Sequence, residues 1–389
     1  MKRFLKIVAI IAAVFLVIHI VLVATYNTHL YKGLVNTYFT GKTGPTIDEY
    51  EIFYNRKINA NDPKPWPVSK EFNKHSLSKK YLDSAEALKS CAFLVFRKDS
   101  LLFEKYWEVY NEDTISNSFS MGKTVVSVLL GIALKEGKIK SLDQPVSDFL
   151  PEYKEGFAAK LTIKNLVTMS SGFNFDEPYK DPFGSPAKAY YGDNLKELVT
   201  HYEVVKEPGK TFEYRSGNTL ILSFVLEKAL GMKISTYCEQ KLWNEIHAEH
   251  FALWNLDHED GDEKSFSSFY ATARDFARLG KLYMDSGKVN GKTIVALDYM
   301  TASVQPAPII DELDNKPTTR YGYGWWLGEF RGHKVFSPIG LNGQYVICIP
   351  DLDIIIVRLG RERISNPEHK LPDDFFLYLN ATFDMLKIK

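Results

Sequence analysis

Two blocks of hydrophobic, β-branched and aromatic residues predict strands near the two ends of the chain. The first block, residues 92–96 and 101–107, is divided by a short polar turn and predicts a β-hairpin. The second block predicts strands at residues 334–337, 345–350 and 354–359, with a turn at 351–353 between the last two. Together the two ends supply about five strands.

Helical periodicity dominates the region between these blocks. The predicted helices cover residues 124–135, 219–230 and 271–284, and a final helix covers residues 373–386. Antiparallel strands from both chain ends, flanked by helices and separated by a mostly helical insertion, predict an α+β fold.

The N-terminal residues have a pattern typical of a membrane-directed segment. Lys2, Arg3 and Lys6 precede an apolar run at residues 7–24 that only His19 interrupts, which is long enough to cross a bilayer. Leu22 occupies a position where signal-peptide cleavage requires a small residue, so residues 1–25 are interpreted as an uncleaved signal anchor. The basic residues predict a cytoplasmic N-terminus and place the domain that follows outside, in the periplasm or extracellular space. A cleaved signal peptide, giving a secreted protein, is the alternative.

Residues 26–82 contain prolines and short polar runs without a sustained period, and are interpreted as a linker and N-terminal extension wrapping onto a domain at residues 83–389. A chain of 389 residues with 45% hydrophobic content can bury a large core. Lys plus Arg and Asp plus Glu number 48 each, which argues against nucleic-acid binding. Three distant cysteines predict neither a zinc site nor a disulfide framework.

The sequence Ser120-Met121-Gly122-Lys123 opens the most apolar of the predicted helices. A residue three positions after a serine lies on the same helical face, so Lys123 is placed to reach the Ser120 hydroxyl. Burial on an apolar helix would lower the pKa of Lys123 and make it a base for an otherwise weak nucleophile. The pattern therefore predicts an activated serine.

The same four residues also fit an ordinary buried helix that begins at a serine cap, with Lys123 extended to solvent. Two further Ser-x-x-Lys copies, Ser76 to Lys79 and Ser185 to Lys188, show that the spacing alone decides nothing. Their surroundings are polar or loop-like, so only the copy at Ser120 is expected to have a desolvated lysine.

Two loops carry further candidate groups. Residues 207–218 form a Gly- and Pro-containing loop before a helix, and Tyr214 within it could exchange protons with a serine if a nearby ammonium stabilised its phenolate. Residues 340–344 lie between two predicted strands, where the backbone N–H groups of Leu341 and Ser120 could form an oxyanion hole. A packed tyrosine and a simple hairpin turn are the structural alternatives.

Together these three segments resemble the serine β-lactamase-like superfamily, which includes class C β-lactamases, low-molecular-weight penicillin-binding proteins, esterases and 6-aminohexanoate-dimer hydrolases. The resemblance spans about residues 92–360 and includes the segments 161–172, 269–280 and 321–326. It implies that Ser120 is the acylated nucleophile, Lys123 its activating amine and Tyr214 the tyrosine of the Tyr-x-Asn-type element. It also implies that Ser120 and Leu341 supply the oxyanion hole, with Ser216, Gly340, Gly343 and Gln344 in the active-site loops.

Two departures separate the chain from enzymes that recognise penicillin. Tyr214-Arg215-Ser216 stands where class C enzymes have Tyr-x-Asn, and this variant is closer to the aminohexanoate-dimer hydrolase branch. Pro338-Ile339-Gly340 stands where penicillin-recognising enzymes have Lys-Thr-Gly, which removes a cation and a hydroxyl for a substrate carboxylate. Efficient β-lactam hydrolysis is not expected.

The sequence thus predicts a membrane-anchored serine hydrolase that cleaves an ester, amide or short peptide through a Ser120 acyl-enzyme, with no metal or organic cofactor. A D-alanyl-D-alanine carboxypeptidase or β-lactamase and a catalytically silent envelope binding protein are the alternatives. Among weaker features, the acidic residues 257–263 are interpreted as a solvated loop, and Trp325 and Trp326 as wall or core residues. Arg358 is interpreted as an exposed strand residue, and the alternative is that it binds an anionic group of the substrate.

Overall fold

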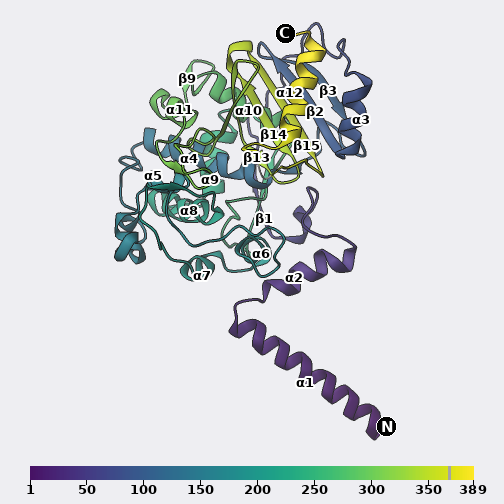
Figure 1. Ribbon diagram of the computed structural model, residues 1–389, viewed down its shortest axis with the longest axis vertical. Helices are drawn as coiled ribbons and strands as arrows, with labels where there is room; N and C mark the ends of the chain where they lie inside the picture. The colour runs from purple at the N-terminus through teal and green to yellow at the C-terminus, as the bar shows by residue number, and fades with distance from the viewer. Residues whose placement is uncertain (367–368) are drawn as a thin grey trace.

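The computed structural model describes residues 1–366 and 369–389 and shows an α+β fold (Figure 1). Its largest sheet is antiparallel, with strand order β11-β12-β14-β15-β2-β3 and with β13 paired to β14. Its strands are β2 (Ser90–Arg97), β3 (Ser100–Tyr106), β11 (Trp326–Phe330), β12 (His333–Ser337), β13 (Ile339–Gly340), β14 (Gln344–Ile349) and β15 (Ile354–Gly360). Strands β2 and β15 pair directly, so the two ends of the chain meet in the middle of the sheet.

This architecture confirms the predicted fold class, the hairpin and the three later strands. The sequence predicted about five strands, whereas this sheet has seven. The two additional strands are β11 and β13. Strand β13 has two residues, too few to show a period, and the run from Trp326 to Phe330 includes Gly328 and Glu329, which interrupt its hydrophobic pattern.

The sheet is buried on both faces, which explains the nearly continuous hydrophobic runs in β14 and β15. On one face, Val346 and Cys348 join the main core beneath the helical region. On the other face, Tyr345 and Ile347 pack in a second core with residues of α3 (Lys79–Ala87) and α12 (Asp373–Leu386). Successive side chains of a strand point to opposite faces, so both cores are built from the same strands.

Helices pack around the sheet (Figure 1). Most of them come from the part of the chain between β3 and β11. The helices are α1 (Lys2–Ala24), α2 (His29–Asn36), α3 (Lys79–Ala87), α4 (Gly122–Lys135), α5 (Ile163–Val167), α6 (Ser185–Tyr191), α7 (Leu195–Thr200), α8 (Ser216–Leu230), α9 (Ile234–Cys238), α10 (Ala273–Met284), α11 (Leu297–Ser303) and α12 (Asp373–Leu386). Short 3₁₀ segments are η1 (Tyr38–Thr40), η2 (Tyr50–Ile52), η3 (Phe119–Met121), η4 (Val146–Asp148), η5 (Pro151–Tyr153), η6 (Gly156–Lys160) and η8 (Pro350–Leu352), and η7 (Glu239–Trp243) is a π-helical turn.

The four predicted helices are present, with small shifts at their starts. Helix α10 begins two residues later than predicted because Thr272 caps it, its hydroxyl accepting a hydrogen bond from the Asp275 N–H. Helix α8 begins at Ser216, directly after the loop that carries Tyr214. Helix α4 is buried from Gly122 to Ala133, as expected for the most apolar helix of the domain.

Smaller sheets join distant parts of the chain. One has the order β1-β6-β7-β4, and the pairs β5–β10 and β8–β9 form two more. These strands are β1 (Asn55–Ile58), β4 (Ser116–Asn117), β5 (Thr211–Phe212), β6 (Ala252–Asn255), β7 (Phe269–Ala271), β8 (Lys288–Val289), β9 (Lys292–Thr293) and β10 (Ile310–Asp311). Strand β4 leads into η3 and α4, while β5 precedes Tyr214, so two of these sheets position candidate site residues.

The N-terminal region has two parts. Helix α1 extends away from the body, and none of its residues is buried (Figure 1). Among the described helices it alone is long and apolar enough to cross a membrane by length and composition. The following residues wrap onto the domain: α2 lies against α6, and β1 pairs with β6.

A buried ion pair fixes the small β5–β10 sheet beside Tyr214. Arg320 donates from Nε and Nη2 to the two carboxylate oxygens of Asp311, at 2.7 and 2.9 Å. The guanidinium also lies 4.8 Å from the ring centre of Phe212. Arg320 therefore ties both strands of this sheet to the segment before β11, and its guanidinium also lies 5.7 Å from the ring centre of Trp326.

We predict that Asp311→Ala lowers the free energy of unfolding by about 3–5 kcal/mol, because it leaves the Arg320 cation buried without its partner. The double variant Asp311→Ala/Arg320→Met should lose less stability than Asp311→Ala alone. Urea unfolding of the full chain in detergent measures both changes. Equal losses in the single and double variants would contradict this account of the pair.

Candidate active site

Ser120 lies in the short 3₁₀ turn between β4 and the buried helix α4. The preceding residue, Phe119, has a φ of +45°, which is uncommon for a residue with a side chain. Its N–H donates to Asn117 Oδ1 at 2.8 Å, and its ring is buried. The surrounding structure thus maintains an unfavourable backbone conformation next to Ser120, which itself lies on the wall of two cavities.

Lys123 reaches Ser120 as the helical spacing predicted. Its Nζ lies 3.0 Å from Ser120 Oγ and 2.8 Å from the carbonyl oxygen of Phe266. The side chain is almost completely buried, with 3% of the residue exposed. Burial lowers the pKa of Lys123 to about 8, although the charge of Glu177 acts in the opposite direction. A pKa of about 8 leaves roughly a tenth of Lys123 neutral at pH 7, far more than for an ordinary lysine.

Tyr214 completes the group around the Ser120 hydroxyl. Its ring centre lies 5.1 Å from Lys123 Nζ and 5.1 Å from the ring of Trp326. Burial raises the pKa of Tyr214 well above 10, and a hydrogen bond with Ser120 only partly opposes this shift. In this structure desolvation outweighs the effect of the neighbouring groups, so the raised pKa of Tyr214 favours its neutral phenol over the phenolate that the sequence analysis expected.

The segment after β13 brings Leu341 to the same place. Leu341 and Ser120 line the same two cavities. Gly340 is required here by space, because a Cβ at this position would collide with the carbonyl oxygen of Ser118. Gln344 supports the segment that carries Leu341, because its Nε2 donates a hydrogen bond of 2.9 Å to the Leu341 carbonyl oxygen.

Arg358 supports this segment and is not the exposed residue that the sequence analysis expected. It is completely buried, and its Nη1 donates to the carbonyl oxygens of Asn342 and Gly343 at 2.8 and 2.7 Å. Its Nη2 donates to the Leu88 carbonyl oxygen at 2.7 Å. Gly343 has a φ of +84° and no room for a side chain next to the guanidinium. Arg358 therefore shapes the turn that presents Leu341.

Glu177 is a site residue that the sequence analysis missed. Its Oε1 accepts a hydrogen bond from the backbone N–H of Ser216, the first residue of α8. Burial raises the pKa of Glu177, and the nearby Lys123 acts to lower it. Glu177 lies in a loop without a recognisable local pattern, and its proximity to Lys123 depends on tertiary packing.

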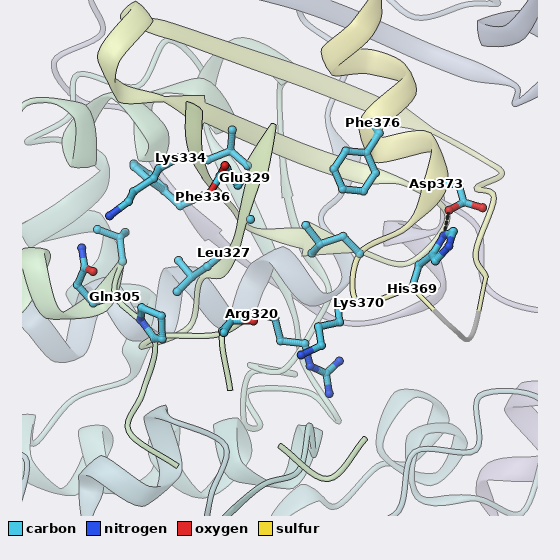
Figure 2. A pocket seen from close by; sticks show the side chains of 16 residues that line it. Gln305, Arg320, Leu327, Glu329, Lys334, Phe336, His369, Lys370, Asp373 and Phe376 are labelled. Carbon is cyan, nitrogen blue, oxygen red and sulfur yellow. Dashed lines mark hydrogen bonds and ion pairs between the residues drawn. The ribbon is translucent and has the colours of Figure 1, made fainter. Parts of the chain in front are cut away.

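Two cavities meet at Ser120. One has a volume of about 400 Å³ and extends toward α2 and α6, and the other has about 200 Å³ and includes Tyr214 and Trp326. A larger hollow of about 810 Å³ lies over β11 and β12 and does not include Ser120 (Figure 2). Figure 2 shows His369 and Lys370 at its edge, and these two residues also line the smaller Ser120 cavity.

The other Ser-x-x-Lys copies are not assembled in this way. Lys79 pairs with Asp83 at the surface, and the Ser185 hydroxyl donates to Asp176. Cys91, Cys238 and Cys348 are buried free cysteines. The two tryptophans have separate positions, since Trp325 is completely buried whereas Trp326 contacts Tyr214.

The acidic loop at 257–263 has a structural position. The Asp257 carboxylate accepts hydrogen bonds from the N–H groups of Leu195, His258 and Asp262, each at 2.8 Å. Asp257 is buried, so this part of the loop is not the solvated segment that the sequence analysis expected. The carboxylate holds the loop against the start of α7.

Comparisons with known proteins identify relatives in sequence and in fold. The 6-aminohexanoate-dimer hydrolase of Paenarthrobacter ureafaciens is 26% identical over 294 residues, which cover 69% of this chain and 72% of that protein. A Bacillus anthracis protein named after the same hydrolase is similar in structure, with a TM-score of 0.74, 19% identity and coverage of 87% of this chain and 92% of that chain. A penicillin-binding protein from Bacillus halodurans has a TM-score of 0.61 and 19% identity, covering 78% of this chain and 99% of that chain.

The sequence model of the family described as Beta-lactamase matches residues 79–375, which include Ser120, Lys123, Tyr214 and Leu341. The match covers most of the chain, and the structural neighbours share its fold. This chain therefore belongs to the beta-lactamase family and is a serine hydrolase of the amidase or esterase type.

Proposed function

We propose that this protein is a membrane-anchored serine hydrolase that cleaves an ester or amide bond through a Ser120 acyl-enzyme. The observation that carries the proposal is the 3.0 Å contact between Ser120 Oγ and the Nζ of a buried lysine whose pKa is lowered to about 8. A lysine used only for structure gains nothing from this desolvation, whereas a base needs it.

Acylation begins with neutral Lys123, which takes the Ser120 proton as Oγ attacks the acyl carbon. The backbone N–H groups of Ser120 and Leu341 stabilise the negative charge that forms on the acyl oxygen. The bond to the leaving group then breaks, and the leaving oxygen or nitrogen receives a proton. Tyr214, a neutral phenol hydrogen-bonded to Ser120, passes this proton onward from the Lys123 ammonium.

Deacylation repeats the same transfers with water as the nucleophile. Water attacks the acyl carbon and gives a proton to Lys123, and the bond between the acyl carbon and Ser120 Oγ breaks. Ser120 regains its proton, and the carboxylic acid is released. These steps use only side-chain and backbone groups of the chain, so the proposal includes no cofactor.

The anchor in this proposal is α1. Its length and composition suit a membrane span, and Lys2, Arg3 and Lys6 favour a cytoplasmic N-terminus. The catalytic domain would then lie outside, in the periplasm or extracellular space. Cleavage after α1 would instead give a secreted form.

A peptidase or β-lactamase activity is the second candidate, and one observation favours it. The chain lacks the Lys-Thr-Gly cation, but Arg363 and Lys370 line the cavity that contains Tyr214. Either cation could bind a substrate carboxylate. The dimer hydrolase named above acts on an aminohexanoate dimer, which supports an amide substrate as well as an ester.

Covalent labelling tests the proposal. The full chain in detergent is treated with a fluorophosphonate probe or a fluorescent penicillin, and intact mass is measured. We predict one fluorophosphonate adduct, its loss in Ser120→Ala and its retention in Ser76→Ala, because Ser76 belongs to an exposed copy of the motif. Penicillin labelling at Ser120 would favour the peptidase candidate, and labelling that survives Ser120→Ala would contradict the proposal.

The lowered pKa of Lys123 predicts the pH dependence of the reaction. Because the neutral amine is the base, kcat/KM should rise with pH and level off above an apparent pKa of about 8, falling about tenfold per pH unit well below that value. Lys123→Arg should abolish turnover, because a guanidinium keeps its proton throughout this range. Initial rates on an ester between pH 6 and 9.5 measure this, and a flat profile would contradict Lys123 as the base.

A further inference from the structure

The larger of the two Ser120 cavities has an apolar wall built partly by the N-terminal segment. Its volume of about 400 Å³ is in the range of small-molecule sites. Leu30 and Leu34 of α2 line it from one side, and Pro186 and Ala187 of α6 line it from another. The same cavity therefore contains an apolar surface and the proposed nucleophile, Ser120.

Helix α2 is fixed as part of this wall. The buried His29 ring makes a hydrogen bond of 2.8 Å to the Pro182 carbonyl oxygen in the loop before α6. Lys32 lies 4.4 Å from the ring centre of Phe53. These contacts attach α2 to the folded domain, so the cavity does not depend on a loose segment.

The positions of the catalytic groups indicate whether the larger cavity binds the acyl group or the leaving group of the substrate. Ser120 and Leu341 line both cavities, as expected for groups that contact the acyl carbon and its oxygen. Tyr214 lines the smaller cavity but is not among the residues that line the larger one. A group that delivers a proton to the leaving atom lies on the leaving-group side, so the acyl chain extends into the α2 cavity.

The same helix lies close to the proposed membrane span. Helix α1 ends at Ala24 and α2 begins at His29, so the connection spans no more than about 18 Å. Tyr38 at the cavity wall is 62% exposed, and Val35 and Phe39 beside the wall are 54% and 80% exposed. Exposed apolar and aromatic side chains beside a membrane span suit the bilayer interface.

We propose that the α2 cavity is an acyl-chain site and that the substrate is an ester or amide of a long apolar acyl group. This inference rests on the proposed function and specifies its substrate class. The reaction transfers the apolar acyl group to Ser120 Oγ and releases the protonated leaving group. Water then releases the acyl group as a long-chain carboxylic acid.

The chain-length dependence of hydrolysis tests this site. The full chain in lipid nanodiscs is assayed with p-nitrophenyl acetate, butyrate, hexanoate and octanoate, each below its micelle concentration. Burial of each methylene should raise kcat/KM by about twofold to fourfold, so the six additional methylenes of octanoate should raise it at least about 60-fold above the acetate value. A flat or falling series would overturn the inference, whereas absence of both acetate hydrolysis and fluorophosphonate labelling would instead contradict the proposed function.

Two variants locate the effect in the cavity. Ala187→Phe fills it, and Leu34→Lys places a charge at its wall on a half-exposed position that folding tolerates. Both should lower the ratio of octanoate to acetate kcat/KM at least tenfold. The matched control Val35→Lys changes the neighbouring exposed residue and should keep the wild-type ratio. Wild-type ratios in both cavity variants would overturn the inference.

A bilayer-embedded substrate distinguishes the source of the acyl group. A 4-methylumbelliferyl palmitate dissolved in the same nanodiscs reports hydrolysis of an ester within the membrane. Hydrolysis of this ester that Leu34→Lys reduces would support the acyl-chain site and assign its substrate to the bilayer. Octanoate preference without palmitate hydrolysis would support the same site with a soluble ester as substrate.

Discussion

The site depends on the burial of one ammonium group. Lys123 is enclosed by the main core at the start of α4, and its Nζ contacts Ser120 Oγ and the Phe266 carbonyl oxygen. Loss of hydration disfavours the charged form, which brings its pKa to about 8. The burial of α4 from Gly122 to Ala133 and the two-sided packing of the sheet maintain this desolvation, so the fold maintains the lowered pKa that the proposed base requires.

The remaining groups of the site are placed by rigid contacts outside it. Arg358 and Gln344 hold the turn that carries Leu341, and the Asp311–Arg320 pair holds the small sheet before Tyr214. Oxyanion stabilisation requires donors that are already oriented when charge develops. Buried polar networks provide this rigidity better than a flexible loop, which explains why the segments around the cavity contain several fully buried charged and polar side chains.

Local sequence patterns predicted the parts of the molecule that depend on local physics. The Ser120–Lys123 contact follows from helical spacing, and the strands of residues 345–350 and 354–359 follow from their composition. The role of Arg358 could not be predicted, because an arginine on a strand gives no sign that its charge is satisfied by carbonyl groups of a distant turn. Glu177 and the α2 wall were missed for the same reason, since their positions result from tertiary packing.

The central claim is that Lys123 has a lowered pKa in the folded protein. Lysine labelled with ¹³C at Cε, in the full chain in detergent, allows NMR titration of each amine between pH 6 and 11. Burial also lowers the pKa of Lys264, to about 7, so Lys264→Met assigns that signal and Lys123→Met assigns the other. The account predicts that the signal lost in Lys123→Met titrates near pH 8. Titration of that signal above pH 10 would contradict it.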